Sequence, residues 1–206
     1  MQGQFRETPI GEADEDGPLT WSAQPDIPPA MRLFVAMSAG LMAWMTLLGA
    51  DAPAKFPAGG MTFTRPATWT WVETTSPMRK AQLGVPGIDG KAGGEVIFFH
   101  FGQGGGGGAK ANVDRWLGQF QEKGDALKSK IEEVTVRGKQ VTFVRAQGTY
   151  LSGMPGGPKT PQPDTMLLGA IVDGPEGSVF IRFTGPTALG AATEAEFRKL
   201  AESGIP

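Results

Sequence analysis

A run of glycines stands where a phosphate-binding loop would stand in a nucleotide-binding protein. Gly102–Gly107 fits the pattern G-x-G-x-x-G, and it follows an apolar run and precedes a helical pattern. Five consecutive glycines match many patterns by chance, and the P-loop pattern fails because Ala109 precedes Lys110 and Ala111 replaces the magnesium-binding hydroxyl. We predict a flexible connection, leaving a weak anion site at Lys110, at the start of the following helix, as an alternative.

Side chains able to do catalysis are scarce. The chain has no cysteine and a single histidine, His100. A metal site would need carboxylates brought together by folding, and a Ser-His-Asp triad would depend on His100 without any G-x-S-x-G elbow. The adjacent Glu132 and Glu133 would point to opposite faces of a strand. We therefore predict no catalytic residue, metal or cofactor, while a hydrolase that uses carboxylates clustered by folding remains an alternative.

The most distinctive cluster of polar and aromatic residues follows the glycines. Asn112, Arg115, Trp116 and Gln119 lie three, four and seven positions apart, which places them nearly on one helical face. Together with His100 they are the candidate ligand-binding residues, in a pocket where a sheet meets a helix. The alternative is structural, with Trp116 packed on the sheet and the polar groups bonded to the backbone.

The elements that would position these residues follow from hydrophobic periodicity. Alternation and β-branched runs predict strands, and stripes at helical spacing predict helices at Ala109–Lys123 and Thr193–Ser203, the second opening with a capping box. The expected strands are 61–66, 68–74, Arg79–Val85, Glu95–Phe101, 132–138, 139–151, 165–173 and 177–185, with a Pro/Gly loop at Met154–Asp164. Hairpins force antiparallel pairing, and one-sided helices must cover a sheet. The predicted fold class is therefore α+β, a twisted antiparallel sheet flanked by helices.

The first part of the chain has a different composition. Residues 1–30 are polar, acidic and proline-containing, and they are predicted to be disordered. Arg32 then precedes an uncharged run from Leu33 to Ala50, followed by an Ala-x-Ala sequence at Ala52–Ala54. This order is typical of a cleaved signal peptide.

Two other interpretations of the apolar run stay open. Its length also suits an uncleaved membrane anchor through residues 31–50, or a buried core helix. If translation begins at Met31, residues 1–30 are not part of the protein and the signal becomes conventional. Signal and anchor both place one α+β domain, residues 55–206, outside the cytoplasm, periplasmic or extracellular. The formal net charge of −2 gives no electrostatic support for a nucleic-acid partner.

Several segments together resemble a known family. They are MTFTRPATWTW, then GEVIFFHFGQGGGGGAKANVDRWLGQF, then a hairpin with GTYL, then MLLGAIVDGPEGSVFIRFTGP and a final EFRKLAESG. This order, with N-x-x-R-W-x-x-Q-F at Asn112–Phe120, is similar to secreted bacterial proteins of the PsbP-like fold. The photosystem II extrinsic protein and a Ran-binding protein of yeast share that fold. The resemblance covers about Met61 to Pro206.

The resemblance implies an α/β/α sandwich and a binding or assembly-support role without catalysis. The metal-binding histidines of photosynthetic members have no match here, since His100 stands alone. The leading hypothesis is a non-catalytic exported domain that binds a protein or a small ligand in the cell envelope. The alternatives are an envelope hydrolase and a small-ligand carrier.

Overall fold

A computed structural model describes residues 52–153 and 156–206 of the 206-residue chain. The expected acidic tail (1–30) and the expected signal peptide or anchor (31–54), except for its last residues Ala52–Ala54, lie outside the described residues. Within the described part, no helix is both long enough and apolar enough to cross a membrane.

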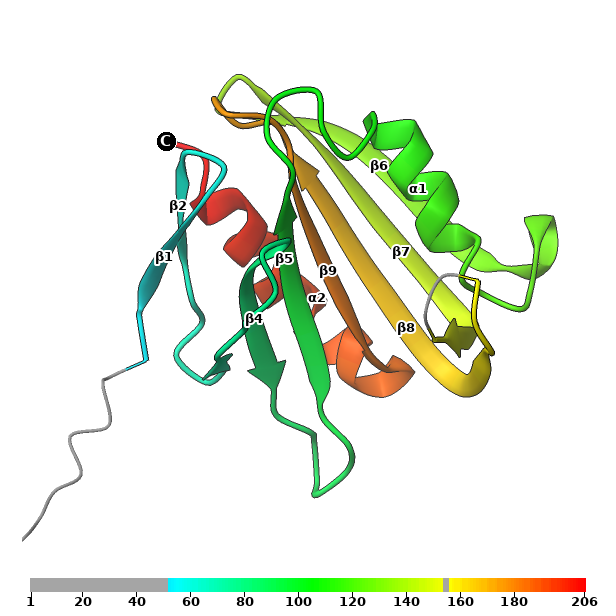
Figure 1. Ribbon diagram of the computed structural model, residues 1–206. Helices are drawn as coiled ribbons and strands as arrows, with labels where there is room; N and C mark the ends of the chain where they lie inside the picture. Colours follow the sequence, from blue (N-terminus) through cyan, green and yellow to red (C-terminus); the bar gives the residue numbers. More distant parts are fainter. Residues whose placement is uncertain (1–51, 154–155) are drawn as a thin grey trace, which may run out of the picture. The chain divides into compact units, whose positions relative to one another are not determined.

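The described part is built on a seven-stranded antiparallel sheet (Figure 1). In spatial order its strands are β3 (Thr70–Val72), β4 (Arg79–Val85), β5 (Gly94–His100), β9 (Val179–Pro186), β8 (Thr160–Val172), β7 (Lys139–Ser152) and β6 (Lys128–Val136). A separate hairpin pairs β1 (Lys55–Ala58) with β2 (Met61–Thr64). Each pair of neighbouring strands is antiparallel, so the predicted α+β fold class is confirmed.

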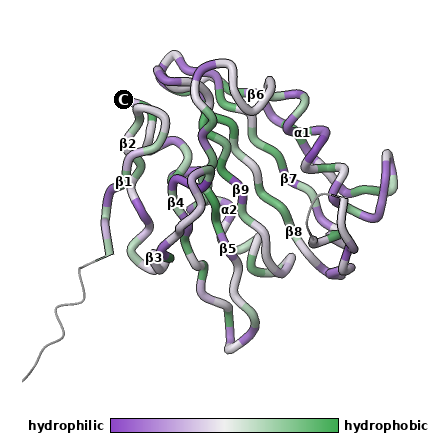
Figure 2. The backbone as a smooth tube through the Cα atoms, in the orientation of Figure 1, coloured by the Kyte–Doolittle hydropathy of each residue, from purple (hydrophilic) through white to green (hydrophobic). Residues whose placement is uncertain are grey.

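Side-chain alternation along the central strands divides the core into two layers. On β5, Val96 and Phe98 join the cluster under α2 (Thr187–Ser203), which also contains Phe197 and Leu200. The β1–β2 hairpin covers the same face, with the Phe56 ring edge-on to Phe98 at 4.9 Å. Successive side chains of a strand point to opposite faces, so one apolar strand serves both layers. The central strands β8 and β9 are largely hydrophobic along their length, as the green colour in Figure 2 shows.

The other face carries α1 (Ala109–Leu117). Val113 and Trp116 of α1 pack against β7 and β8, in a cluster that includes Val144 and Leu167. The helix is short and covers only this part of the face, as Figure 1 shows. A 3-10 turn, η2 (Gly124–Ala126), leads from the α1 side into β6. Helices on both faces of an antiparallel sheet are the arrangement that the PsbP-like resemblance implied.

The first helix is shorter than predicted. The sequence pattern extends it to Lys123, but α1 ends at Leu117, where the Gly118 N–H bonds the Asp114 carbonyl. The next residues pair with β7 instead, through a bridge between Phe120 and Tyr150. A tertiary pairing therefore replaces the last helical turn, and the amphipathic pattern alone could not reveal it.

The C-terminal half differs from prediction at two further boundaries. Helix α2 begins at Thr187, and Thr193 lies buried within it, so the predicted capping box is wrong. Pro186, which precedes the first helical residue, sets that start. The predicted Met154–Asp164 loop is also too long, because β8 starts at Thr160 and pairs there with the end of β7.

Candidate functional site

Asn112, the first residue of the predicted binding cluster, organises the glycine loop. Its side chain is 2% exposed, and its amide nitrogen donates to the carbonyl oxygens of Gly106, Gly107 and Gly108 at 2.8, 3.2 and 3.1 Å. Three loop carbonyls therefore converge on an amide donor, whereas a phosphate cradle presents backbone N–H groups. The loop therefore differs in geometry from a phosphate cradle, and the flexible connection expected from the sequence stays a prediction.

Lys110, the predicted weak anion site, has a carboxylate partner. Its ammonium nitrogen lies 2.7 Å from Asp114 Oδ2, one helical turn further on, and its side chain is 89% exposed. An exposed pair of this kind contributes little to stability. It does place a negative charge beside the only lysine at the start of α1, so an anion would have to compete with Asp114.

Trp116 and His100 lie on opposite faces of the sheet. Trp116 is 5% exposed and sits over Gly169 of β8, where an added Cβ would come within 2.3 Å of its ring. His100 faces the β1–β2 turn, close to Gly59, with Nδ1 at 3.4 Å from the Ser178 carbonyl oxygen. The structure thus does not bring His100 together with the α1 cluster.

Gln119 connects the end of α1 to the sheet. Its Oε1 accepts hydrogen bonds from the Tyr150 hydroxyl at 3.1 Å and from Arg182 Nη1 at 3.3 Å. Arg182 belongs to β9, and its guanidinium carbon stands 5.8 Å from the centre of the Phe99 ring. Its Nε is buried without a hydrogen-bond partner in the described residues. Gln119 therefore fixes an arginine that sequence analysis did not single out.

Three arginines on the α1 side of the sheet share an unusual set of partners. Arg79 donates to Gln82 Oε1 at 2.8 Å, Arg115 donates to Asn112 Oδ1 at 2.8 Å, and Arg182 donates to Gln119. Within the described residues, the cations in ion pairs are Lys110, Lys130, Arg145 and Arg198, so these three have neutral amide partners only. We call Arg79, Arg115 and Arg182 the arginine face.

A pocket of about 600 Å³ lies at one end of the same face. Three segments line it: the end of the β4–β5 connection (92–95), the start of β8 (162–165) and the end of β9 (184–186). Its size falls within the range of about 300–1,000 Å³ that is usual for ligand sites. We call it the hairpin pocket. Gly93, Gly94 and Gly185 are among the residues that line it.

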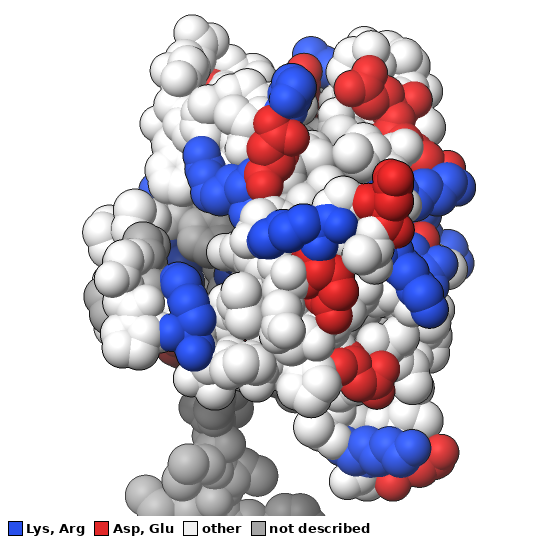
Figure 3. Space-filling model, turned by 90° about the vertical axis from the view of Figure 1, so that its right-hand side faces the viewer, with Lys and Arg blue, Asp and Glu red and all other residues white. Residues whose placement is uncertain are grey.

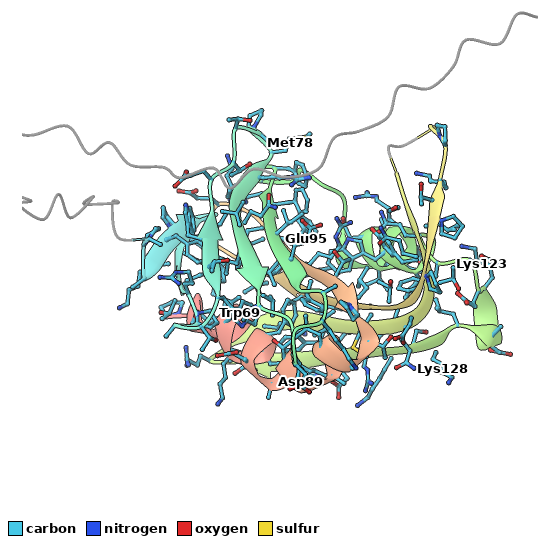
Figure 4. All side chains as sticks on the ribbon, turned by 90° about the horizontal axis from the view of Figure 1, so that it is seen from below. Trp69, Met78, Asp89, Glu95, Lys123 and Lys128 are labelled. Atoms are coloured by element: carbon cyan, nitrogen blue, oxygen red, sulfur yellow. The ribbon has the colours of Figure 1, made fainter. Side chains whose placement is uncertain are left out.

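Glu95 is one of the two charged residues that line the hairpin pocket. Its two carboxylate oxygens accept from Gln82 Nε2 at 3.3 Å and from Thr184 Oγ1 at 3.4 Å, both long contacts from neutral donors. Asp164, on the β8 side, is a second carboxylate in the lining. In Figure 4, Glu95 and Met78 lie on the side of the sheet that carries α1. The pocket therefore offers two carboxylates and hydroxyls to a ligand.

Hydrogen bonds link the hairpin pocket to the arginine face. Arg79 donates to Gln82, Gln82 donates to Glu95, and Thr184 donates to Glu95, so the chain of bonds crosses β4, β5 and β9. A charged residue inside an apolar strand is the sequence signal that could have revealed Glu95 and Arg182. Their meeting on one face depends on the pairing of β5 with β9, which joins distant segments.

Charged groups on the α2 side are paired with one another. Arg198 of α2 forms ion pairs with Glu132 and Glu194, and its guanidinium lies 4.3 Å from the centre of the Phe143 ring. Hydrogen bonds from Lys130 and Arg198 hold the pKa of Glu132 below its ordinary value. Acidic and basic side chains also lie next to one another on the side of the molecule that faces the viewer in Figure 3, which is the right-hand side of Figure 1. We interpret the α2-side cluster as structural.

Comparison with known proteins gives remote likenesses in structure. No family model matches the chain, and no curated protein matches it either. A protein of unknown function from Pseudomonas aeruginosa is similar at a TM-score of 0.43 and 13% identity, covering 74% of this chain and 95% of its own. The PsbP protein of the cyanobacterium Synechocystis is similar at a TM-score of 0.45 and 15% identity, covering 75% and 94%. We take no function from either likeness.

Proposed function

We propose that this chain is a non-catalytic exported domain that binds a small ligand in the cell envelope, with the hairpin pocket as its binding site. The observation that supports this most directly is Glu95, a carboxylate held at the pocket by neutral donors only. A carboxylate with weak donors gains most from a ligand that brings a charged or strong hydrogen-bond donor. We therefore expect a ligand with an ammonium group or several hydroxyls.

The placement of reactive groups supports a binding role over a catalytic one. His100 faces the β1–β2 turn, on the opposite side of the sheet from Glu95. The described residues hold no group of three or more His, Asp or Glu side chains arranged to bind a metal ion. A metal-activated water would need such a group, and a histidine acting as general base would need to lie at the pocket.

A thermal-shift titration tests the pocket. Spermidine, arginine, glucose and citrate are each added to the domain. We expect at least one of the first three, which carry cations or hydroxyls, to raise the Tm, whereas the anion citrate should not. A ligand at a hundredfold excess over its Kd stabilises by about 2.7 kcal/mol. A domain of 150–250 residues gains about 2–4 °C in Tm for each kcal/mol.

Two charge-removing variants localise the effect. Glu95→Gln should abolish the shift, while Glu133→Gln, which removes an exposed carboxylate from edge strand β6, should leave it unchanged. An equal shift in both variants would show that the ligand binds elsewhere. If spermidine, arginine and glucose all leave the Tm unchanged, the result counts against the pocket as a binding site.

Export rests on the sequence of residues 31–54 and has its own test. N-terminal sequencing of the protein purified from cells should give a start near Lys55 if the signal peptide is removed. Recovery of Leu33–Ala50 in the mature protein would instead support the membrane anchor. Recovery of the mature chain from the cytoplasmic fraction would contradict both.

One observation favours the hydrolase alternative. Glu95 and Asp164 line the same pocket, and paired carboxylates perform glycoside hydrolysis in many enzymes. Turnover of chromogenic glycosides that is lost in both Glu95→Gln and Asp164→Asn, with binding retained, would establish catalysis. Binding without turnover would support the non-catalytic proposal.

A further inference from the structure

The arginine face carries positive charge that the described protein groups do not neutralise. Each of Arg79, Arg115 and Arg182 uses a hydrogen bond to an amide oxygen, yet a guanidinium has five N–H donors. The buried Nε of Arg182 has no partner among the described residues. Leaving a buried donor unbonded is unfavourable, but a ligand at the surface cannot reach this enclosed atom, so the binding argument rests on the other guanidinium nitrogens.

The three arginines come from three separate elements of the fold. Arg79 is on β4 and Arg182 is on β9, with β5 between them, which sets their backbones roughly 10 Å apart at about 4.8 Å per strand. Arg115 is on α1, one helical turn before Gln119, the residue that Arg182 contacts. An extended segment with several carboxylates could bond each of the three arginines through a different carboxylate.

Exposed apolar side chains border the same face. Met78, directly before β4, is 57% exposed, and Phe101, directly after β5, is 40% exposed. Phe101 is stacked on Phe99 with ring centroids 6.3 Å apart and an interplanar angle of 6°, and Phe99 in turn lies beneath Arg182. Arginine, methionine and aromatic residues are enriched at protein interfaces relative to other surface.

We propose that the arginine face binds an extended acidic segment of a partner protein. Its carboxylates would bond Arg79, Arg115 and Arg182, and its apolar side chains would contact Phe101 and Met78. Glu95 of β5 lies close to this face, two residues before Ile97, the partner of Arg182. Its single negative charge is smaller than the three positive charges of the arginines, so the face keeps a net positive charge. The surface is distinct from the hairpin pocket, so it goes beyond the small-ligand function proposed above.

Fluorescence anisotropy with a defined peptide tests the proposal. The probe is a fluorescein-labelled peptide of alternating Glu and Leu, and its matched control has Gln in place of each Glu. We expect the acidic peptide to bind at low salt, to weaken as salt is added, and to bind far better than the control. Arg182→Gln should weaken binding about tenfold, as expected for a hydrogen bond between charged groups, and the exposed Arg115→Gln about threefold.

Matched variants separate the face from general charge. Lys199→Gln removes one exposed cation from α2, on the opposite face, and should bind the peptide like the unmodified protein. Arg115→Gln carries the test if Arg182→Gln does not fold, because Arg115 is exposed. Equal binding of the acidic and Gln peptides, or equal weakening by Lys199→Gln and Arg115→Gln, would overturn the proposal. Citrate that competes with the peptide and binds with a Kd as low as that of the peptide would also overturn the proposal. The face would then be a site for a small polycarboxylate.

Discussion

The contact between Gly169 and Trp116 gives a prediction with a definite magnitude. Gly169→Ala would place a Cβ 2.3 Å from Trp116 Cζ3 and 2.6 Å from Cε3, whereas carbon atoms settle about 3.5–4.0 Å apart. The indole must move by roughly 1 Å, and Trp116 is only 5% exposed, so its surroundings resist that motion. Overpacking of this kind costs about 1–3 kcal/mol.

A second effect partly offsets the clash. Alanine is favoured over glycine within a strand by about 0.5–1 kcal/mol, because the glycine loses more conformational freedom on folding. We therefore expect Gly169→Ala to lower the free energy of unfolding by about 1–2 kcal/mol. Urea unfolding followed by tryptophan fluorescence and by circular dichroism measures this change, with the slope against urea unaltered.

Two further variants decide whether the clash is the cause. Gly108→Ala is the control, since a Cβ there meets no atom within 4 Å and the residue has a negative φ, so it should show no clash and only the cost of alanine at the N-cap of α1, about 0.5–1 kcal/mol. Trp116→Phe removes part of the ring that Gly169 contacts, so the double variant should be more stable than the sum of the single effects predicts. Strict additivity, or a Gly169→Ala protein as stable as the original, would refute the packing argument.

Three other predictions concern polar contacts. Hydrogen bonds from the backbone N–H groups of Glu122 itself and of Thr149 hold the pKa of Glu122 below its ordinary 4.5. The stability that Glu122 contributes is therefore present above pH 4.5 and lost as pH falls through the lower folded-state pKa. In Glu122→Gln, the urea concentration at the midpoint of unfolding should therefore fall less steeply as the pH is lowered below 4.5. Asn112→Ala should cost about 1–3 kcal/mol and speed amide exchange in the glycine loop, as hydrogen-exchange mass spectrometry would show. Arg65→Gln removes donors to the backbone carbonyls before β1, so trypsin should cut faster after Lys55; an unchanged rate would contradict this.

Local sequence patterns were enough to predict the sheet and its hairpins. Val96 and Phe98 alternate with Ile97, and the tight turn at Arg137–Gly138 joins β6 to β7, so both signals come from neighbouring residues. The small β1–β2 sheet was not predicted in full. Its first strand, Lys55–Ala58, has two apolar side chains directed inward and too few residues to show a period.

The candidate site was harder to predict because distant segments build it. Asn112, Arg115, Trp116 and Gln119 were found from helical spacing, but the structure gives them different environments, and Asn112 holds a loop while Trp116 packs on the sheet. Arg182 was missed because one arginine in an apolar strand has no local partner to mark it. Its contact with Gln119 exists only after the sheet has formed.

The central position of β9 has a consequence for the order of events during synthesis. Strands β3 to β5 form one run of neighbours in sequence and space and β6 to β8 form another, while β9, which follows the other described strands in sequence, lies between β5 and β8. The pairing of His100 with Val179 shows how far apart in sequence the joined segments are. Such non-local pairing forms late and slowly. The two halves of the sheet thus cannot be united until the ribosome has released the segment that contains β9, so the complete sheet forms only after most of its strands have been synthesised.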